Sequence, residues 1–188
     1  MRKVEFANGE LYHIYNRGVE KRDIFMNLED RLRFSQSINA FNNLEPVGSL
    51  LENSAVKNQN KKEGGKRLVM IVCYALNLNH YHFILRQNEN KGIEKFMHRL
   101  GTGYTNYFNL KHKHKGHLFQ GTFKAIHVDS NEYLLRLSVY VNLNHRVHKF
   151  GSLASKMAAT SWEQFINLAK GKKPIVIDNK IILEQFNN

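Results

Sequence analysis

The sequence predicts an α+β fold, in which helices pack on a mostly antiparallel sheet. Short runs that alternate apolar and polar residues, or are apolar throughout, are mixed with longer runs at helical spacing. They lack the regular strand–helix–strand rhythm that is typical of a parallel sheet. The chain has 188 residues, of which 42% are hydrophobic, so it can bury one substantial core. We expect one domain over residues 1–150 and a short helical tail over 151–188.

The first third of the chain predicts a strand, a helix and a loop. "ELYHIYNRGVEK" alternates apolar and polar residues up to Gly18, which indicates a strand followed by a turn. "NLEDRLRFSQSINAFNN" has apolar residues at near-helical spacing, with Asn27 as its cap. Residues 42–66 are rich in Asn and Lys and end in Gly-Gly, so we expect a flexible insertion there.

The rest of the predicted domain contains a β-hairpin, two helices and another strand. "RLVMIVCYALNL" is typical of a buried strand, and "HYHFILRQ" follows closely enough to be its antiparallel neighbour. "KGIEKFMHRLGTGYTNYFNLKH" predicts a helix that Gly101 and Gly103 weaken, so a kink is allowed. After the strand "TFKAIHVD", the run "SNEYLLRLSVYVNLNHRVHKFG" predicts a helix capped by Asp129 or Ser130 that ends before Gly151.

The charge balance favours a polyanionic partner. Lys and Arg number 28 against 16 Asp and Glu, a net charge of +12, which suits nucleic acid or an anionic membrane surface. No apolar run approaches the roughly 18 residues that cross a bilayer, and the first residues lack the apolar core of a signal peptide. Cys73 is the one cysteine, which excludes an internal disulfide and fits a reducing cytoplasm. We expect a cytoplasmic protein that binds nucleic acid and does not enter a membrane.

Two histidines, His80 and His82, stand inside the apolar run "YALNLNHYHFIL". In a strand, residues i and i+2 point to one face, about 6.6 Å apart, so both imidazoles can converge on one cation. The same pattern fits surface or hydrogen-bonded histidines in a chain that has ten. With no Cys or acidic residue nearby, a closed tetrahedral zinc site is not expected. A catalytic cation with open positions would need a third ligand.

The helix near residue 140 offers that ligand and a nucleophile. Tyr140 and Asn144 are four residues apart and would share a helix face. A tyrosine beside a metal-held phosphate can attack it, because the cation stabilises the phenolate and the phosphoryl charge. The same residues could instead form one packed stripe with Tyr133, Leu137 and Val141. Spacing alone leaves both interpretations open.

Three stretches, "LNLNHYHFIL", "GHLFQGTFKAIHVDSNEYLL" and "YVNLNHRV", together and in this order resemble the IS200-like, REP-associated single-tyrosine transposases, a branch of the HUH endonucleases. "YHIYNRGVEKRDIF" is similar to that family's opening strand and turn, so the resemblance covers roughly residues 10–150. The usual Pro-Asn before the first histidine reads Leu78-Asn79 here, and the usual Asn-Pro after the tyrosine reads Asn144-His145. Neither change removes a reactive atom.

The resemblance implies a ferredoxin-like or RNA-recognition-motif-like sheet and a transposase that cleaves and rejoins single-stranded, hairpin-containing DNA. His80, His82 and Asn144 would bind Mg²⁺ or Mn²⁺. Tyr140 would attack a phosphodiester, giving a 5′-phosphotyrosine and a free 3′-hydroxyl without a need for ATP. Basic and loop residues close to this site in the sequence are candidate DNA contacts. They are Arg17, Lys21, Arg22, Lys111, Lys113, Lys115, Phe119, Gln120, Lys124, Arg146 and Lys149.

Other interpretations of the same sequence stay open. A non-catalytic nucleic-acid-binding module would keep the basic residues and lose the metal and tyrosine set. A domesticated REP-type repeat nuclease would share the chemistry and differ only in its biology. A metal-dependent phosphodiesterase would use activated water in place of Tyr140. Family members often work as dimers, so a homodimer is compatible with the resemblance, as is a prokaryotic, nucleoid-associated location.

Overall fold

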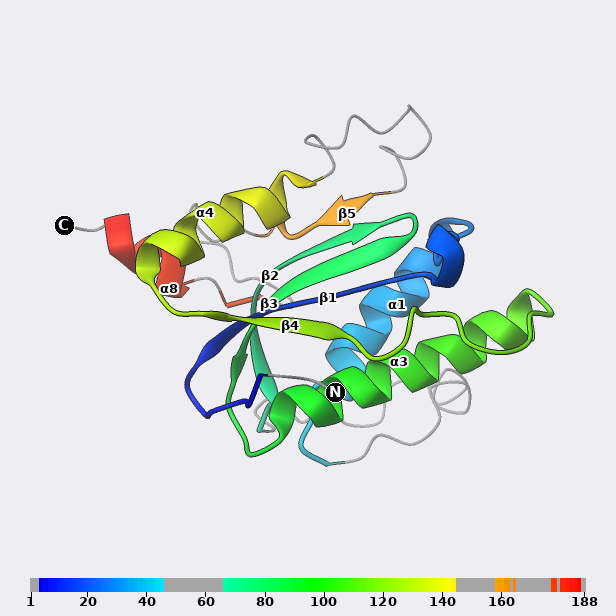
Figure 1. Cartoon of the computed structure of the whole chain (residues 1–188), viewed down its shortest axis with the longest axis horizontal. Coiled ribbons are helices and arrows are strands. Elements are labelled where there is room, and N and C mark those ends of the chain that lie inside the picture. Colours follow the sequence, from blue (N-terminus) through cyan, green and yellow to red (C-terminus); the bar gives the residue numbers. More distant parts are fainter. Residues whose placement is uncertain are drawn as a thin grey trace.

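An antiparallel sheet of five strands lies at the centre of the chain (Figure 1). The computed structural model describes residues 4–45, 66–144, 158–162, 164, 177–178 and 180–186. In spatial order the strands are β4 (Lys124–Val128), β1 (Leu11–Arg17), β3 (His80–Gln87), β2 (Val69–Asn77) and β5 (Ala159–Thr160). The predicted α+β class is confirmed, as is the antiparallel hairpin of β2 and β3.

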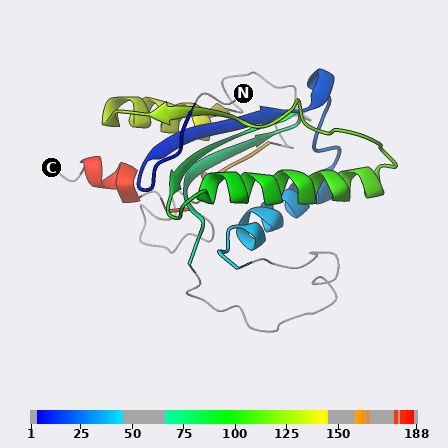
Figure 2. The ribbon, with the colours of Figure 1, turned by 60° about the horizontal axis from the view of Figure 1, so that its bottom comes forward.

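Helices cover both faces of this sheet (Figure 2). One face carries α1 (Leu28–Phe41) and α3 (Gly92–Lys111), and the other carries α4 (Asn131–Asn142). Three short helical segments complete the described elements: η1 (Val19–Lys21), α8 (Lys180–Leu183) and η2 (Glu184–Phe186). The sheet therefore separates two apolar layers, and a residue's position in its strand decides which layer it joins.

The layer under α1 and α3 is built from large aromatic side chains. Tyr12, Tyr81 and Phe83 alternate with residues of the opposite face along β1 and β3, and they meet Phe34 of α1 and Tyr104 of α3. Each is at most 2% exposed, and burying one such side chain stabilises the fold by about 1.5–3 kcal/mol. This face of the sheet is consequently a packed core.

The layer under α4 is smaller and aliphatic. Leu134, Leu137 and Val141 follow one another at helical spacing on α4 and pack with Ile84 and Cys73 of the sheet. Cys73 is fully buried, and this burial raises the pKa of its thiol. Beyond these residues, toward the His80 end of β3, the same face becomes polar.

The ends of the helices agree with the sequence in part. Asn27 accepts from Asp30 N at 3.0 Å, as predicted, and Ser130 accepts from Tyr133 N at 3.3 Å. α4 ends at Asn142, short of the predicted end before Gly151, and residues 145–150 lie outside the described residues. Most of the 42–66 insertion and of the C-terminal tail lies outside the described residues, and β5 is a strand that no sequence pattern indicated.

The long helix α3 passes through its two glycines without a break. Gly103 has a packing reason, since a Cβ there would lie 2.8 Å from Cε2 of Phe41 at the end of α1. The glycine therefore permits the close approach of α1 and α3 that covers this face. The sequence suggested that these glycines weaken the helix, but Gly103 lies where α1 and α3 cross. The reason for a glycine at this position is the packing of the two helices.

Candidate active site

The strand register gathers polar residues on the α4 face at one end of the sheet. Directly paired residues of antiparallel strands share a face. Two such rows cross the sheet here: Lys124, Tyr15, His82 and Ala75 form one, and Arg17, His80 and Asn77 form the next. His80 and His82 thus point to one face, as predicted, with Arg17 on one side and Asn77 on the other.

His80 is held by asparagines at both of its ring nitrogens. Nδ1 lies 2.6 Å from Oδ1 of Asn79, whose amide nitrogen donates to the carbonyl of Lys21. An amide oxygen can only accept, so the proton of the imidazole is on Nδ1. Nε2 then carries a lone pair, and it lies 3.1 Å from Nδ2 of Asn77. This is the tautomer in which Nε2 can bind a metal.

His82 is held by His13, which the sequence analysis did not single out. Nδ1 of His82 lies 2.9 Å from Nε2 of His13, and the two rings stack with centroids 5.1 Å apart. His13 is 6% exposed, and burial lowers its pKa to about 4, so the ring is neutral at pH 7. A neutral His13 protonated on Nδ1 accepts from Nδ1 of His82. In that arrangement the lone pair of the His82 imidazole is on Nε2.

Tyr140 and Asn144 reach the same place from the other layer. The ring of Tyr140, on α4, is centred 5.7 Å from the ring of His82 and stands edge-on to it. Asn144 follows Leu143, the C-cap of α4, and it is fully buried. Its Oδ1 accepts from Nδ2 of Asn77 at 2.7 Å. The four predicted residues are therefore brought together, although Asn144 lies past the helix that carries Tyr140.

Among the described residues, two buried side-chain amide atoms of this cluster have no hydrogen-bond partner: Oδ1 of Asn77 and Nδ2 of Asn144. Such atoms usually indicate a missing water, ion or ligand. Within the described residues, no three His, Cys, Asp or Glu side chains lie close enough to form a metal site. The candidate donors are two imidazoles and amide oxygens, a set that leaves positions open for a substrate.

Most of the predicted DNA contacts lie around this end of the sheet. Gly18 N donates to Asn79 O at 2.8 Å, and Gln120 N donates to Arg17 O at the same distance. Arg22 is hydrogen-bonded to His114, which brings the neighbouring Lys113 and Lys115 close to the turn after β1. Lys124 stands in the row of His82. Arg146 and Lys149 lie outside the described residues.

Lys111 and Phe119 are engaged inside the protein. The ammonium of Lys111 is 2.8 Å from carboxylate oxygens of both Glu29 and Asp30. Phe119 is 8% exposed, and its ring packs edge-on against Tyr81. Both side chains therefore make their contacts within the protein.

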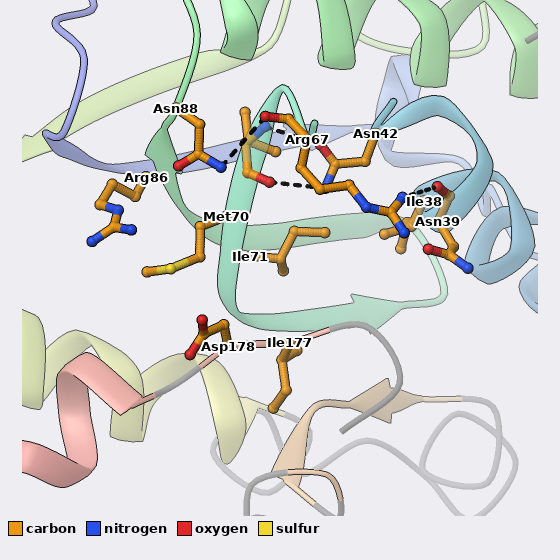
Figure 3. Close-up of a pocket in the computed structure, with 11 residues that line it drawn as sticks. Ile38, Asn39, Asn42, Arg67, Met70, Ile71, Arg86, Asn88, Ile177 and Asp178 are labelled. Carbon is orange, nitrogen blue, oxygen red and sulfur yellow. Dashed lines mark hydrogen bonds between the residues drawn. The ribbon is translucent and has the colours of Figure 1, made fainter. Parts of the chain in front are cut away.

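A separate hollow of about 310 Å³ lies at the opposite end of β2 and β3 (Figure 3). Its lining includes Arg67, Arg86 and Asp178, and Nη1 of Arg67 donates to the carbonyl of Asn39. Val69 and Gln87, which pair at this end, are eight and seven residues from Asn77 and His80. The hollow is therefore distinct from the histidine cluster.

A protein-family model matches part of the chain. Residues 53–144 match the family described as "Transposase IS200 like", a range that contains His80, His82, Tyr140 and Asn144. This segment belongs to the IS200-like transposase family. The predicted family resemblance is confirmed, and the IS200-like segment ends at the last predicted metal ligand. The opening strand with His13 and Arg17 lies before the matched range.

The fold of this chain also has a solved counterpart. A REP-associated tyrosine transposase bound to a REP hairpin is similar over 95% of this chain and 90% of its own, with a TM-score of 0.61 and 12% identity. At this identity the likeness shows the shared fold. No curated protein matches the chain in sequence. In the described part of the structure, no helix has the length and apolarity to span a membrane.

Proposed function

We propose that the protein is a metal-dependent single-strand DNA endonuclease and strand transferase that works through Tyr140. The observation that carries this proposal is the convergence of β3 and the end of α4. It brings His80 and Asn144 to the two sides of Asn77, and it sets Tyr140 against His82. A nucleophile beside a pair of correctly oriented imidazoles is the arrangement that phosphoryl transfer with a cation requires.

The residues fit a divalent cation such as Mg²⁺ or Mn²⁺. Nε2 of His80 and of His82 would hold it together with Oδ1 of Asn144. The hydrogen bonds to Asn79 and His13 orient both rings for this purpose. A bound cation would supply charge stabilisation on the phosphate oxygens. The unpartnered buried amide atoms of Asn77 and Asn144 support the presence of a ligand here.

Tyr140 would form the covalent bond. Its Oη loses a proton and attacks the phosphorus of a DNA phosphodiester, and the bond from phosphorus to the 3′ oxygen breaks. The 3′ oxygen leaves as a hydroxyl after it takes up a proton, and the 5′ phosphate stays on Tyr140. Because the phosphotyrosine keeps the energy of the phosphodiester, a 3′-hydroxyl can reverse the step and join strands.

Single-stranded DNA with a hairpin is the substrate class that we propose. The basic residues around the histidine end of the sheet would neutralise phosphates, so binding should weaken as salt rises. They are Arg17, Lys21, Arg22, Lys113, Lys115 and Lys124, with Gln120 beside them. The similar solved transposase is bound to a REP hairpin, which supports a stem-loop as the first substrate to test.

The test is a covalent adduct on a denaturing gel. With Mn²⁺ and a library of labelled single-stranded stem-loops, we expect a DNA–protein band and a free 3′-hydroxyl product, and we expect EDTA to remove both. Cleavage without an adduct would support the activated-water mechanism. Stem-loop binding with neither cleavage nor adduct would support the non-catalytic module.

Replacing His13 should weaken metal binding although His13 is not itself a proposed metal ligand. His13→Leu removes the acceptor for Nδ1 of His82, and loss of such an orienting contact usually costs ~10- to 100-fold in metal affinity. His13→Gln keeps a side-chain oxygen as acceptor and should retain most of the affinity. Calorimetric titration of each protein with Mn²⁺ measures the effect. Equal affinity in the His13→Leu variant and the wild type would contradict this role.

A further inference from the structure

The amide of Asn77 occupies the gap between two proposed metal ligands. Its Nδ2 is 3.1 Å from Nε2 of His80 and 2.7 Å from Oδ1 of Asn144. Asn77 itself is fully buried, at the end of β2 directly across from His80. Its own oxygen, Oδ1, has no hydrogen-bond partner in the described part of the chain.

The hydrogen bonds of His80 determine which way this amide faces. Since Nδ1 of His80 donates to Asn79, Nε2 can only accept, and Asn77 must present its NH₂ group to it. Oδ1 of Asn144 is likewise an acceptor. One NH₂ group thus lies against both Nε2 of His80 and Oδ1 of Asn144, the two atoms that a cation would use.

A cation cannot take the position between Nε2 of His80 and Oδ1 of Asn144 while this NH₂ group lies there. The NH₂ group of an amide has no lone pair to offer a metal, and its hydrogens fill the space between the two ligand atoms. A half turn about the Cβ–Cγ bond of Asn77 exchanges Nδ2 and Oδ1. After that turn an oxygen stands where the NH₂ group stood, and the site gains a hard ligand of the kind that Mg²⁺ prefers.

The distances suit such an exchange. Octahedral Mg²⁺ has bonds of about 2.1 Å, so neighbouring ligand atoms lie about 3.0 Å apart. The position now held by Nδ2 of Asn77 is 3.1 Å from one ligand atom and 2.7 Å from the other. An oxygen at this position would therefore share an octahedral edge with each of them.

We propose that Asn77 is a further metal ligand, whose amide turns to present Oδ1 to the cation beside His80 and Asn144. This inference rests on the proposed function, because it concerns the same metal site. Without a cation, two amide oxygens 2.7 Å apart would repel, so the NH₂ group faces inward. A cation reverses this preference because it attracts both oxygens. In the absence of a cation, the hydrogen bonds of the Asn77 NH₂ group accordingly hold His80 and Asn144 close together.

Titration of the whole protein with Mn²⁺, without DNA, tests the proposal. Asn77→Asp has the same shape and supplies a charged oxygen, so we expect ~10-fold tighter binding. Asn77→Leu supplies no oxygen, and we expect ~10-fold weaker binding. Asn43→Asp is the matched control for charge. Asn43 pairs with Arg67, which precedes Val69 at the far end of β2 from Asn77. The strand from Val69 to Asn77 is about 26 Å long at 3.3 Å per residue, so substitution of Asn43 should leave the affinity unchanged.

Each outcome bears on the proposal. If Asn77 only positions Asn144 by a hydrogen bond, Asn77→Asp will not bind more tightly than the wild type, and the proposal is wrong. If the Asn77→Leu variant shows no cooperative thermal unfolding, it is not folded, and the affinity of Asn77→Asp alone tests the proposal. An Asn77→Leu variant that binds Mn²⁺ like the wild type overturns the proposal. Even then, formation of the DNA adduct by the wild type would still support the proposed function. A wild type that binds no Mn²⁺ overturns the metal site altogether.

Discussion

Replacing Tyr140 with phenylalanine is expected to abolish DNA cleavage and adduct formation while leaving hairpin affinity within about twofold of the wild type. The change removes Oη alone, and the remaining ring can keep its edge-on contact with His82, whose centroid is 5.7 Å away. Loss of a nucleophile commonly lowers the rate by more than about 10⁴-fold. Denaturing gels measure the chemistry, and fluorescence anisotropy measures binding.

Tyr133→Phe is the matched control for this experiment. Tyr133 lies at the start of α4 and is partly buried against the same apolar layer, so the substitution removes the same atom from the same helix. We expect it to cleave like the wild type. Cleavage that survives in Tyr140→Phe would mean that water attacks the phosphate, and the covalent mechanism would then be abandoned.

The sequence predicted the structure correctly where a hydrophobic pattern lies within a single strand or helix. The alternation in β1 and the apolar run of β2 reflect faces that those strands bury by themselves. The i and i+2 spacing placed His80 and His82 on one face before any neighbour was known. The end of α4 was missed, because no Gly or Pro near Leu143 marks it in the sequence.

The residues that orient the site could not be read from spacing. His13 meets His82 only through the register of β1 with β3, and Asn77 meets His80 only through the register of β2 with β3. Neither strand pairing can be recognised from a pattern of neighbouring residues in the sequence. The alternation of "LYHIYNR" does place His13 on the face of Arg17, which was the one available signal.

The net charge also predicted the proposed DNA-binding surface only in part. The net charge of +12 indicates a basic surface, but it does not say which cations are exposed. Lys111 belongs to the basic stretch before β4, yet its ammonium contacts Asp30 and Glu29 of α1, 81 and 82 residues away in the chain. A contact of that separation depends on the packing of α1 against α3. The structure thus identifies a lysine that serves the fold.

Asp30→Ala is expected to be among the most destabilising single substitutions in the described part of the chain. Asp30 is fully buried, and its carboxylate accepts from Met26 N, Tyr107 Oη, Lys111 Nζ and His112 Nε2, all within 3.0 Å. Alanine would leave these donors without their shared acceptor. Breaking a buried ion pair from one side costs about 3–5 kcal/mol, and the partial exposure of Lys111 favours the lower figure.

The effect should also depend on pH, with a defined sign. Burial alone would raise the pKa of Asp30, but the hydrogen bonds from Lys111, Met26 and Tyr107 and the nearby His112 lower it below its ordinary value. A lowered pKa means that the folded state prefers the charged carboxylate, so this stabilisation is present above about pH 4 and is lost as the pH falls through the folded-state pKa. The difference in unfolding free energy between the wild type and Asp30→Asn should therefore be larger at pH 7 than at pH 3.

Urea denaturation at both pH values measures this difference, and Glu29→Ala is the control. Glu29 contacts the same ammonium at 2.8 Å, but its side chain is 75% exposed, so its loss should change the unfolding free energy by less than about 0.5 kcal/mol. If Asp30→Ala and Glu29→Ala were equally mild, the network would not stabilise the junction of α1 and α3. Lys111 would then be available for DNA, as the sequence had suggested.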